Sequence, residues 1–159
     1  MLQTAFPSWL YPVTQGATTI WEHWDGLKDD GSMWSADMNS FNHYAYGAIG
    51  EWMYRAMAGI EADPEHPGFK HAILYPRIGG NLKYTAGKYH SIYGDVGVKW
   101  EVQGKQITLT VQIPVNTTAE IRLDQAKAVL ESDGLTFTRE ADYMAAEAGS
   151  GTYHIAFEQ

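Results

Sequence analysis

The sequence changes character across residues 62–68, where two prolines and a glycine stand within the heptapeptide ADPEHPG. Proline removes a backbone donor and clashes with the preceding turn, so a helix is not expected to continue through such a segment. Five of the six tryptophans precede residue 60, and only Trp100 follows it. We therefore expect two pieces, residues 1–66 and residues 67–159, that differ in their internal structure.

The piece before the break contains one long segment with helical spacing, residues 41–61. Ser40 is a plausible N-cap for it. Large and small apolar groups lie on more than one face, which predicts a helix that is buried on two sides. A single helix cannot supply the neighbours that such burial needs. A shorter helix is expected over residues 18–24, capped by Thr18 or Thr19.

The piece after the break has a period of two, which is typical of strands with one buried face. Residues 96–102 and 107–113 alternate strictly, and the link QGKQ between them suits a hairpin. Residues 124–131 fit either a short helix or a strand after a turn. Further strands are expected at residues 71–75, 119–123 and 153–157, with weaker signals at 82–84 and 91–93. The pattern predicts an antiparallel β-sandwich.

The charge balance limits the class of partner. The chain carries 11 Lys and Arg against 19 Asp and Glu, a net charge of −8. This argues against nucleic acid and anionic membranes, because both attract clustered cations. Since the chain has no cysteine, disulfides, thiol catalysis and Cys-ligated zinc are excluded. We expect a soluble chain without a signal peptide of its own, which leaves the cytoplasm, the periplasm and the exterior open.

Glu22 is the first candidate for chemistry. It lies between Trp21 and His23, with Trp24 next, in a segment rich in aromatic residues. Sugar sites combine aromatic faces, which cover the C–H faces of the ring, with carboxylates that bind hydroxyls. Glycoside hydrolysis needs two carboxyl groups of this kind. The alternative is that Glu22 is an exposed helix residue beside tryptophans of the core.

His43 is the second candidate. A histidine near the start of an aromatic helix is either a packed or capping residue or a contact to a ligand. The six histidines show no HExxH or similar spacing, so no metal site is expected. The acidic residues of the segment 25–37 lack the spacing of a calcium loop and predict a solvated loop. No nucleotide-binding loop or GxSxG motif is present, and we expect no cofactor.

Three tyrosines of the second piece allow two roles. Tyr84, Tyr89 and Tyr93 either line a groove on the β-region or pack against its faces and edge, and packing is the more ordinary role.

Three stretches taken together resemble glycoside hydrolase family 78, the bacterial and fungal α-L-rhamnosidases. They are PSWLYP with GATTIWEHWD at residues 7–12 and 16–25, MNSFNHYAYG at 38–47, and PGFK at 67–70. The resemblance covers roughly residues 1–70. It implies an α+β fold, in which the terminal helices of an (α/α)6 barrel over residues 1–66 are followed by a C-terminal β-sandwich over residues 67–159.

The same resemblance implies roles for both candidates. The glutamate of TTIWE resembles the family's general base, and here it is Glu22. The histidine of SFNHY resembles a residue that contacts the bound rhamnose, and here it is His43. The implied mechanism is inversion at the anomeric carbon of a terminal α-L-rhamnosyl residue, with Glu22 taking a proton from the attacking water. The implied partners are rhamnose-containing glycosides or polysaccharides.

The departure from the family is the missing proton donor. No acidic residue of this chain matches the family's acid motif, and whole enzymes of this type are several times longer. We therefore expect the isolated chain to be inactive. We also expect its exposed helical part to self-associate or to dock onto the β-region.

The alternative function is a non-catalytic β-sandwich that binds carbohydrate or has a structural role. The β-region and the missing acid fit that alternative. A pure binding module, however, has no reason to keep a general base beside a histidine that contacts sugar. The pair of motifs therefore favours the enzyme fragment.

Overall fold

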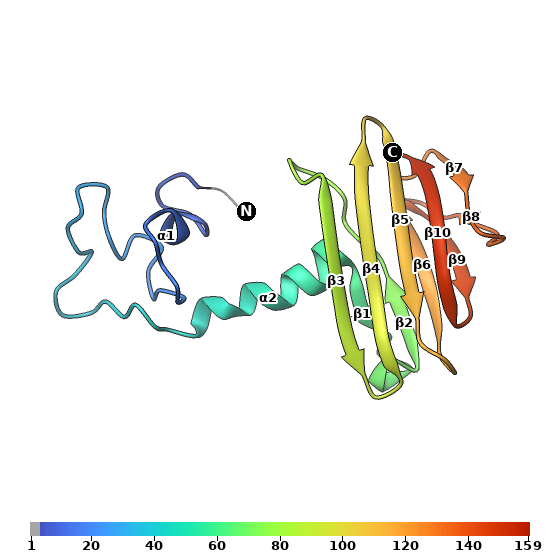
Figure 1. Cartoon of the computed structure of the whole chain (residues 1–159), viewed down its shortest axis with the longest axis horizontal. Helices are drawn as coiled ribbons and strands as arrows, with labels where there is room; N and C mark the ends of the chain where they lie inside the picture. Colours follow the sequence, from blue (N-terminus) through green and yellow to red (C-terminus); the bar gives the residue numbers. More distant parts are fainter. Residues whose placement is uncertain (1–3) are drawn as a thin grey trace. The chain divides into compact units, whose positions relative to one another are not determined.

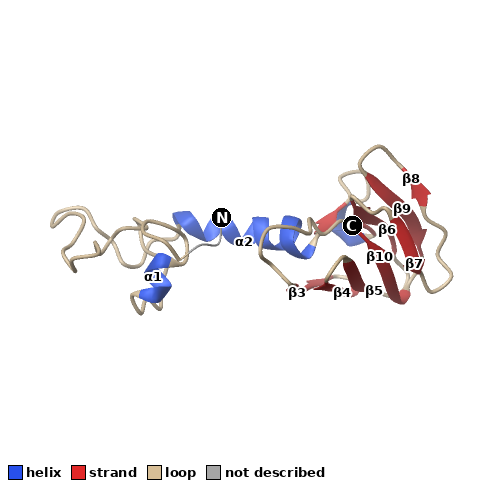
Figure 2. Cartoon of the chain, turned by 90° about the horizontal axis from the view of Figure 1, so that it is seen from above, coloured by secondary structure: helices blue, strands red, loops and turns tan. Residues whose placement is uncertain are grey.

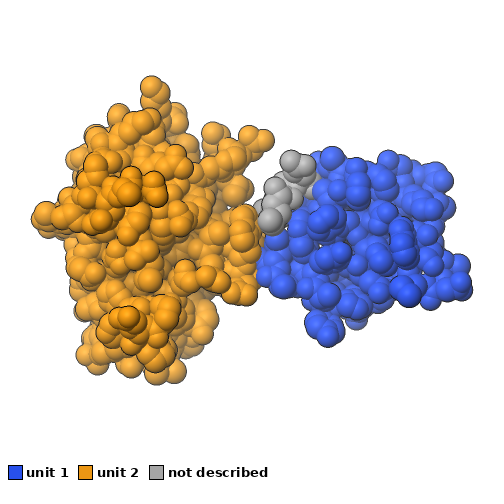
Figure 3. Space-filling model, turned by 180° about the vertical axis from the view of Figure 1, so that it is seen from behind, with its two compact units in different colours: residues 1–50 blue, residues 51–159 orange. Residues whose placement is uncertain are grey.

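The chain folds into two compact units, residues 1–50 and residues 51–159, which Figure 3 colours separately. The computed structural model describes residues 4–159. None of the helices in that range combines the length and the apolar character needed to cross a bilayer.

The first unit consists mainly of turns and loops around a small aromatic core. Its helix α1 (Tyr11–Thr14) has a proline in its first turn, where the missing N–H costs nothing, and the chain turns away at Gly16 with a φ of +82°. Tyr11 and Trp21 are its buried aromatic side chains. The predicted helix over residues 18–24 is wrong, because this segment is non-helical and bonds to residues 40–43.

One continuous helical stretch follows. It begins as the 3-10 turn η1 (Ala45–Ala48), continues as α2 (Ile49–Trp52) and ends as the π-helical turn η2 (Met53–Ala58). The helix expected over residues 41–61 is therefore right in its middle and wrong at both ends. Tyr44, not Ser40, is the N-cap residue, and it makes no capping bond through its side chain.

The faces of this stretch that the sequence predicts to be buried are largely exposed. Trp52 is 39% exposed and Tyr54 46%, while Ala58 is its buried member. The second unit begins inside the stretch, at Glu51.

The stretch ends because Gly59 adopts a left-handed conformation, with a φ of +73°. A Cβ at this position would lie 2.0 Å from the backbone nitrogen of Pro76. The chain then turns into the first strand, and the Tyr75 N–H donates to the Gly59 carbonyl at 2.8 Å. Only glycine fits this close approach of two backbones.

The second unit is a sandwich of two five-stranded sheets. The first sheet has the order β1-β2-β6-β9-β8, and its strands are β1 (Ile60–Ala62), β2 (His71–Leu74), β6 (Thr118–Asp124), β9 (Tyr143–Ala148) and β8 (Thr138–Arg139). Its pairs are antiparallel except β2 and β6, which run parallel. The short turn η3 (Pro67–Phe69) lies in the link between β1 and β2.

The second sheet is antiparallel throughout and has the order β3-β4-β5-β10-β7. Its strands are β3 (Tyr84–Ser91), β4 (Gly94–Gln103), β5 (Gln106–Ile113), β10 (Gly151–Glu158) and β7 (Ala128–Glu131). Gln103 pairs with Gln106 across the predicted hairpin, and Gly104 in its turn has a φ of +65°. Figure 1 shows β3 at one edge of this sheet, and Figure 2 shows the two sheets as separate layers.

The core fills the space between the sheets with the alternating residues that the sequence predicts. Trp100 and Phe157 are fully buried from the second sheet, as are Leu74 and Ile121 from the first. The indole N–H of Trp100 donates to the Met57 carbonyl at 2.8 Å, which joins the end of the helical stretch to the sheet. The predicted sandwich is confirmed, with one parallel pair among its antiparallel ones.

The two weaker strand signals, at residues 82–84 and 91–93, coincide only with the ends of a single strand, β3, at Tyr84 and Ser91. Residues 124–131 resolve into a turn followed by β7, so the strand alternative is the correct one. Strands β1, β8 and β9 are not predicted from the sequence pattern.

Candidate functional site

Backbone hydrogen bonds place the two predicted site residues on neighbouring segments of the first unit. The Glu22 N–H donates to the Ser40 carbonyl at 2.8 Å, and the His43 N–H donates to the Ile20 carbonyl, also at 2.8 Å. The Thr19 hydroxyl donates to the Phe41 carbonyl. The chain between these segments therefore forms a closed loop whose two ends carry the candidates.

The carboxylate of Glu22 is oriented by the opposite segment. Its Oε2 accepts a hydrogen bond of 2.9 Å from the Ser40 N–H, and the side chain is partly buried. Glu22 and Ser40 thus bond reciprocally, backbone to backbone and carboxylate to backbone. Such a carboxylate is held in place while its other oxygen remains able to accept a further proton or hydrogen bond.

The ring of His43 is oriented by the residues that follow it. Its Nδ1 accepts a bond of 3.3 Å from the Ala45 N–H, and its ring stacks on Tyr44 with centroids 5.5 Å apart and planes inclined by 3°. A ring that accepts at Nδ1 carries its proton at Nε2 when it is neutral. His43 is therefore set up to donate from Nε2 to a hydroxyl oxygen.

Aromatic side chains surround the segment that carries Glu22. Trp21 meets Phe41 edge to face at 4.9 Å, and Trp24 stacks on Tyr46 at 5.4 Å. Trp9 contacts both Trp24 and Tyr46, at 5.5 and 5.3 Å. The sequence shows that this segment is rich in aromatic residues, but it does not predict which rings contact one another.

His23 is a residue of this segment that the sequence did not single out. Its ring stacks on Trp34 at 4.0 Å, with planes inclined by 23°, and Trp34 is 41% exposed. The residues that bring Trp34 back form a small turn, in which the Lys28 N–H donates to the Ser32 carbonyl and the Trp34 N–H to the Gly26 carbonyl. The sequence shows the aromatic run that contains His23, but it does not predict the loop that places Trp34 beside His23.

Several buried polar atoms of this unit have no hydrogen-bond partner within residues 4–159. They are Nε2 of His23, Nε1 of Trp24 and Oδ1 of Asn39. Buried polar groups are ordinarily paired, and leaving one unpaired costs about 1–3 kcal/mol.

The acidic segment between the two candidates forms a loop. Asp30 accepts bonds from the N–H and the hydroxyl of Ser32 at 2.9 and 2.6 Å, and these bonds hold the pKa of its carboxyl below the ordinary value. Asp29, Asp30 and Asp37 are exposed. Across the described residues, no three histidine, aspartate or glutamate side chains are grouped to hold a metal ion.

Two family descriptions match consecutive parts of the chain. Residues 1–57, which contain Glu22 and His43, match the bacterial α-L-rhamnosidase 6-hairpin glycosidase domain. Residues 59–137 match the bacterial α-L-rhamnosidase C-terminal domain. The two matches meet at the end of the helical stretch.

Individual relatives agree with these matches. An α-L-rhamnosidase of Streptomyces avermitilis is 42% identical over 156 residues, which is 96% of this chain and 15% of the relative. One from Formosa agariphila is 39% identical over 140 residues, 87% of this chain and 15% of the relative. The chain thus spans about a seventh of the length of these curated relatives.

Solved structures show the same likeness. A crystal structure of the Streptomyces avermitilis α-L-rhamnosidase complexed with L-rhamnose matches with a TM-score of 0.86 and 39% identity, over 98% of this chain and 15% of that one. The α-L-rhamnosidase from Dictyoglumus thermophilum matches with a TM-score of 0.81 and 27% identity, over 100% of this chain and 18% of that one.

Proposed function

Since the chain belongs to the bacterial α-L-rhamnosidases, with the end of the 6-hairpin glycosidase domain followed by the C-terminal domain, we propose that it contributes the general base of such an enzyme. The substrate class is a glycoside or polysaccharide with terminal α-L-rhamnosyl residues. The observation that carries the proposal is the paired arrangement of the segments that hold Glu22 and His43. The presence of L-rhamnose in a related structure supports the choice of sugar.

The chemistry follows from the geometry of the two side chains. Glu22, anchored through Oε2, takes a proton from a water as that water attacks the anomeric carbon. His43 donates from Nε2 to a hydroxyl of the sugar and so orients the ring. The aromatic cluster around Trp24 offers apolar faces for the C–H groups of the sugar.

The mechanism needs a second carboxyl group that protonates the departing oxygen. In inverting enzymes the two carboxyl groups stand about 6.5–9.5 Å apart, which leaves room for the water. The family resemblance assigns that acid to a part of the enzyme upstream of the matched segment. The isolated chain should therefore lack rhamnosidase activity.

The test is a chimera in which this chain replaces the corresponding segment of the Streptomyces avermitilis relative. The isolated chain should not hydrolyse an aryl α-L-rhamnoside, whereas the chimera should. Glu22→Ala in the chimera should lower kcat about 10²–10⁴-fold, the usual contribution of a general base. Azide should restore turnover of that variant and give the glycosyl azide of inverted configuration, since azide needs no base. His43→Ala should raise KM more than it lowers kcat.

A matched control is Glu140→Gln, which removes an exposed carboxylate of the second unit and should leave the kinetics of the chimera unchanged. Turnover by the isolated chain that Glu22→Gln abolishes would show that the chain carries its own acid. Full activity of the Glu22→Ala chimera would remove Glu22 from the mechanism.

The second candidate function, a carbohydrate-binding or structural β-sandwich, rests on residues 51–159 folding as a compact unit with their own core. It is compatible with the first, because the two functions involve different units.

A further inference from the structure

A pocket of about 420 Å³ opens in the second unit, where the end of the helical stretch lies beside β1 and β3 (Figure 1). It is lined chiefly by Tyr54, Arg55, Ile60, Glu61, Phe69 and Tyr89. Its volume falls within the range of about 300–1,000 Å³ that is usual for small-molecule sites. None of its lining residues belongs to the segments that carry Glu22 and His43.

The apolar side of the pocket is built from aromatic rings. Tyr89 stacks on Phe69, with centroids 4.4 Å apart and planes inclined by 29°, and this contact fixes the orientation of the Tyr89 ring. Tyr89 is 42% exposed and Tyr54 46%, so both rings present surface to a ligand. Ile60 at the start of β1 is buried and closes the base. Such faces suit the C–H groups of a sugar ring.

The polar rim of the pocket is an ion-pair network. Arg55 binds Glu51 at 3.1 Å and Glu61 at 2.7 Å, each through a single carboxylate oxygen. The hydrogen bond to Glu51 and the charge of Glu61 raise the pKa of the Arg55 guanidinium above its ordinary value, so Arg55 stays charged. The second oxygen of each carboxylate can accept a bond from a hydroxyl group.

We propose that this pocket is a second, non-catalytic sugar site, which takes one neutral pyranose unit with its C–H face on Tyr54 and Tyr89 and its hydroxyls on Glu51 and Glu61. The rim holds two carboxylates against one guanidinium, and the whole chain has a net charge of −8, so an anionic sugar would be repelled.

The other conceivable occupant is a protein segment, and the charges of the rim disfavour it. Glu51 and Arg55 pair one turn apart on the helical stretch, and both side chains are exposed. An apolar segment packed there would remove these charges from water, and their mutual attraction does not reliably repay that cost. A sugar, by contrast, supplies hydroxyl donors to them.

The experiment is saturation-transfer difference NMR of the 159-residue chain with methyl α-L-rhamnoside, a method that also works if the chain self-associates. The choice of this neutral probe rests on the proposed function, whereas the site itself does not. We expect saturation of the protons on one face of the ring. Tyr54→Ala and Tyr89→Ala should each weaken binding about fivefold or more, the scale of a lost aromatic contact. The part of the signal that is lost in Tyr54→Ala and Tyr89→Ala should persist in Glu22→Gln and His43→Ala.

Tyr84→Ala is the matched control, because Tyr84 is also an exposed tyrosine, at the start of β3, and does not line the pocket. Tyr89→Phe should bind normally, since it keeps the stacked ring, and so separates a lost contact from a folding defect. The absence of saturation transfer would overturn the proposal. So would binding that disappears with His43→Ala and survives Tyr54→Ala and Tyr89→Ala, or a stronger response to D-glucuronate than to the neutral probe.

Discussion

At Gly59 the backbone passes from the last helical turn into β1 with a φ of +73°, and it approaches the Tyr75–Pro76 peptide so closely that any Cβ would overlap it. Gly104, in the hairpin between β4 and β5, has a similar φ of +65° but open space around it. Alanine substitutions at the two positions therefore distinguish the free-energy cost of a left-handed backbone from the cost of steric overlap.

Gly59→Ala should destabilise the second unit by about 3 kcal/mol or more, because a left-handed alanine costs about 1–2 kcal/mol and overpacking about 1–3 kcal/mol. Gly104→Ala should cost only the contribution of the left-handed backbone, about 1–2 kcal/mol. Urea unfolding followed by the far-ultraviolet circular dichroism of the strands, which belong to the second unit, measures both losses. Equal losses in the two variants would mean that the backbone near Pro76 moves aside without strain.

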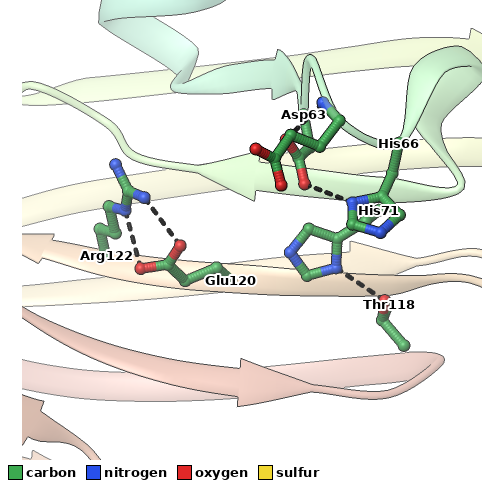
Figure 4. Close-up of polar contacts among 7 residues, drawn as sticks. Asp63, His66, His71, Thr118, Glu120 and Arg122 are labelled. Carbon is green, nitrogen blue, oxygen red and sulfur yellow. Dashed lines mark hydrogen bonds and ion pairs between the residues drawn. The ribbon is translucent and has the colours of Figure 1, made fainter.

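A series of polar contacts runs from the link between β1 and β2 across to β6 (Figure 4). His66 Nδ1 donates to Asp63 at 2.7 Å, the His66 and His71 rings lie 5.6 Å apart, and His71 bonds to Thr118 at 2.7 Å. The bond from His66, followed by that from the Glu65 N–H, holds the pKa of the Asp63 carboxyl below its ordinary value. Folding thus favours the ionised form of Asp63.

This pKa shift predicts how stability depends on pH. The contribution of Asp63 is complete above its unfolded pKa of about 3.9 and is lost as the pH falls through the lower folded value. Asp63→Asn should therefore lower Tm at neutral pH, and the gap to the unmodified chain should close in acid. Thermal unfolding at a series of pH values measures this, with the exposed Asp142→Asn as the control. A gap that stays constant across the series would contradict the assignment.

The elements that the sequence predicted well are those whose signal is local. Strands β5 and β6 bury alternate residues, as does β4 around Trp100, so the period of two is visible there without knowledge of the partner strands. The sequence missed β1 because Ile60–Ala62 continues a helical pattern and becomes a strand only by pairing with β2. The parallel pairing of β2 with β6 likewise depends on residues far apart in the chain.

The candidate site shows the same limit. The motifs indicate Glu22 and His43 as candidates, but the predicted helix over residues 18–24 is absent. Their N–H and C=O groups bond to residues 40–43, a choice that local propensity cannot reveal. The bond that orients the Glu22 carboxylate comes from the Ser40 backbone, which has no signature in the sequence.

For the whole molecule, the two units differ in how well they bury their apolar groups. The second has a continuous core between its sheets. Large apolar side chains are exposed along the first unit and the helical stretch, among them Val13, Met38, Tyr44, Trp52 and Met53. The boundary between the two pieces at residues 66 and 67 stays a prediction. The two family matches change over between residues 57 and 59.

We expect the chain to self-associate through its helical part, because exposed apolar patches of this kind promote association. Sedimentation equilibrium should show a mass that rises with concentration. Replacing Trp52 and Met53 by glutamine should weaken the association, whereas Ile92→Ser, which changes a side chain that is 84% exposed in the second unit, should not. A monomer at every concentration would contradict this expectation.

The closed loop between the Glu22 and His43 segments has a practical consequence. Its ends are fixed by backbone bonds, and its tip at Asp29–Gly31 is exposed, with an inner turn bonded on its own between Lys28 and Ser32. Lengthening a loop costs little, about 0.6 kcal/mol for each doubling. The tip is therefore a permissive insertion point, where an epitope or a fluorescent reporter can be added close to the candidate site while the register of the two segments is preserved.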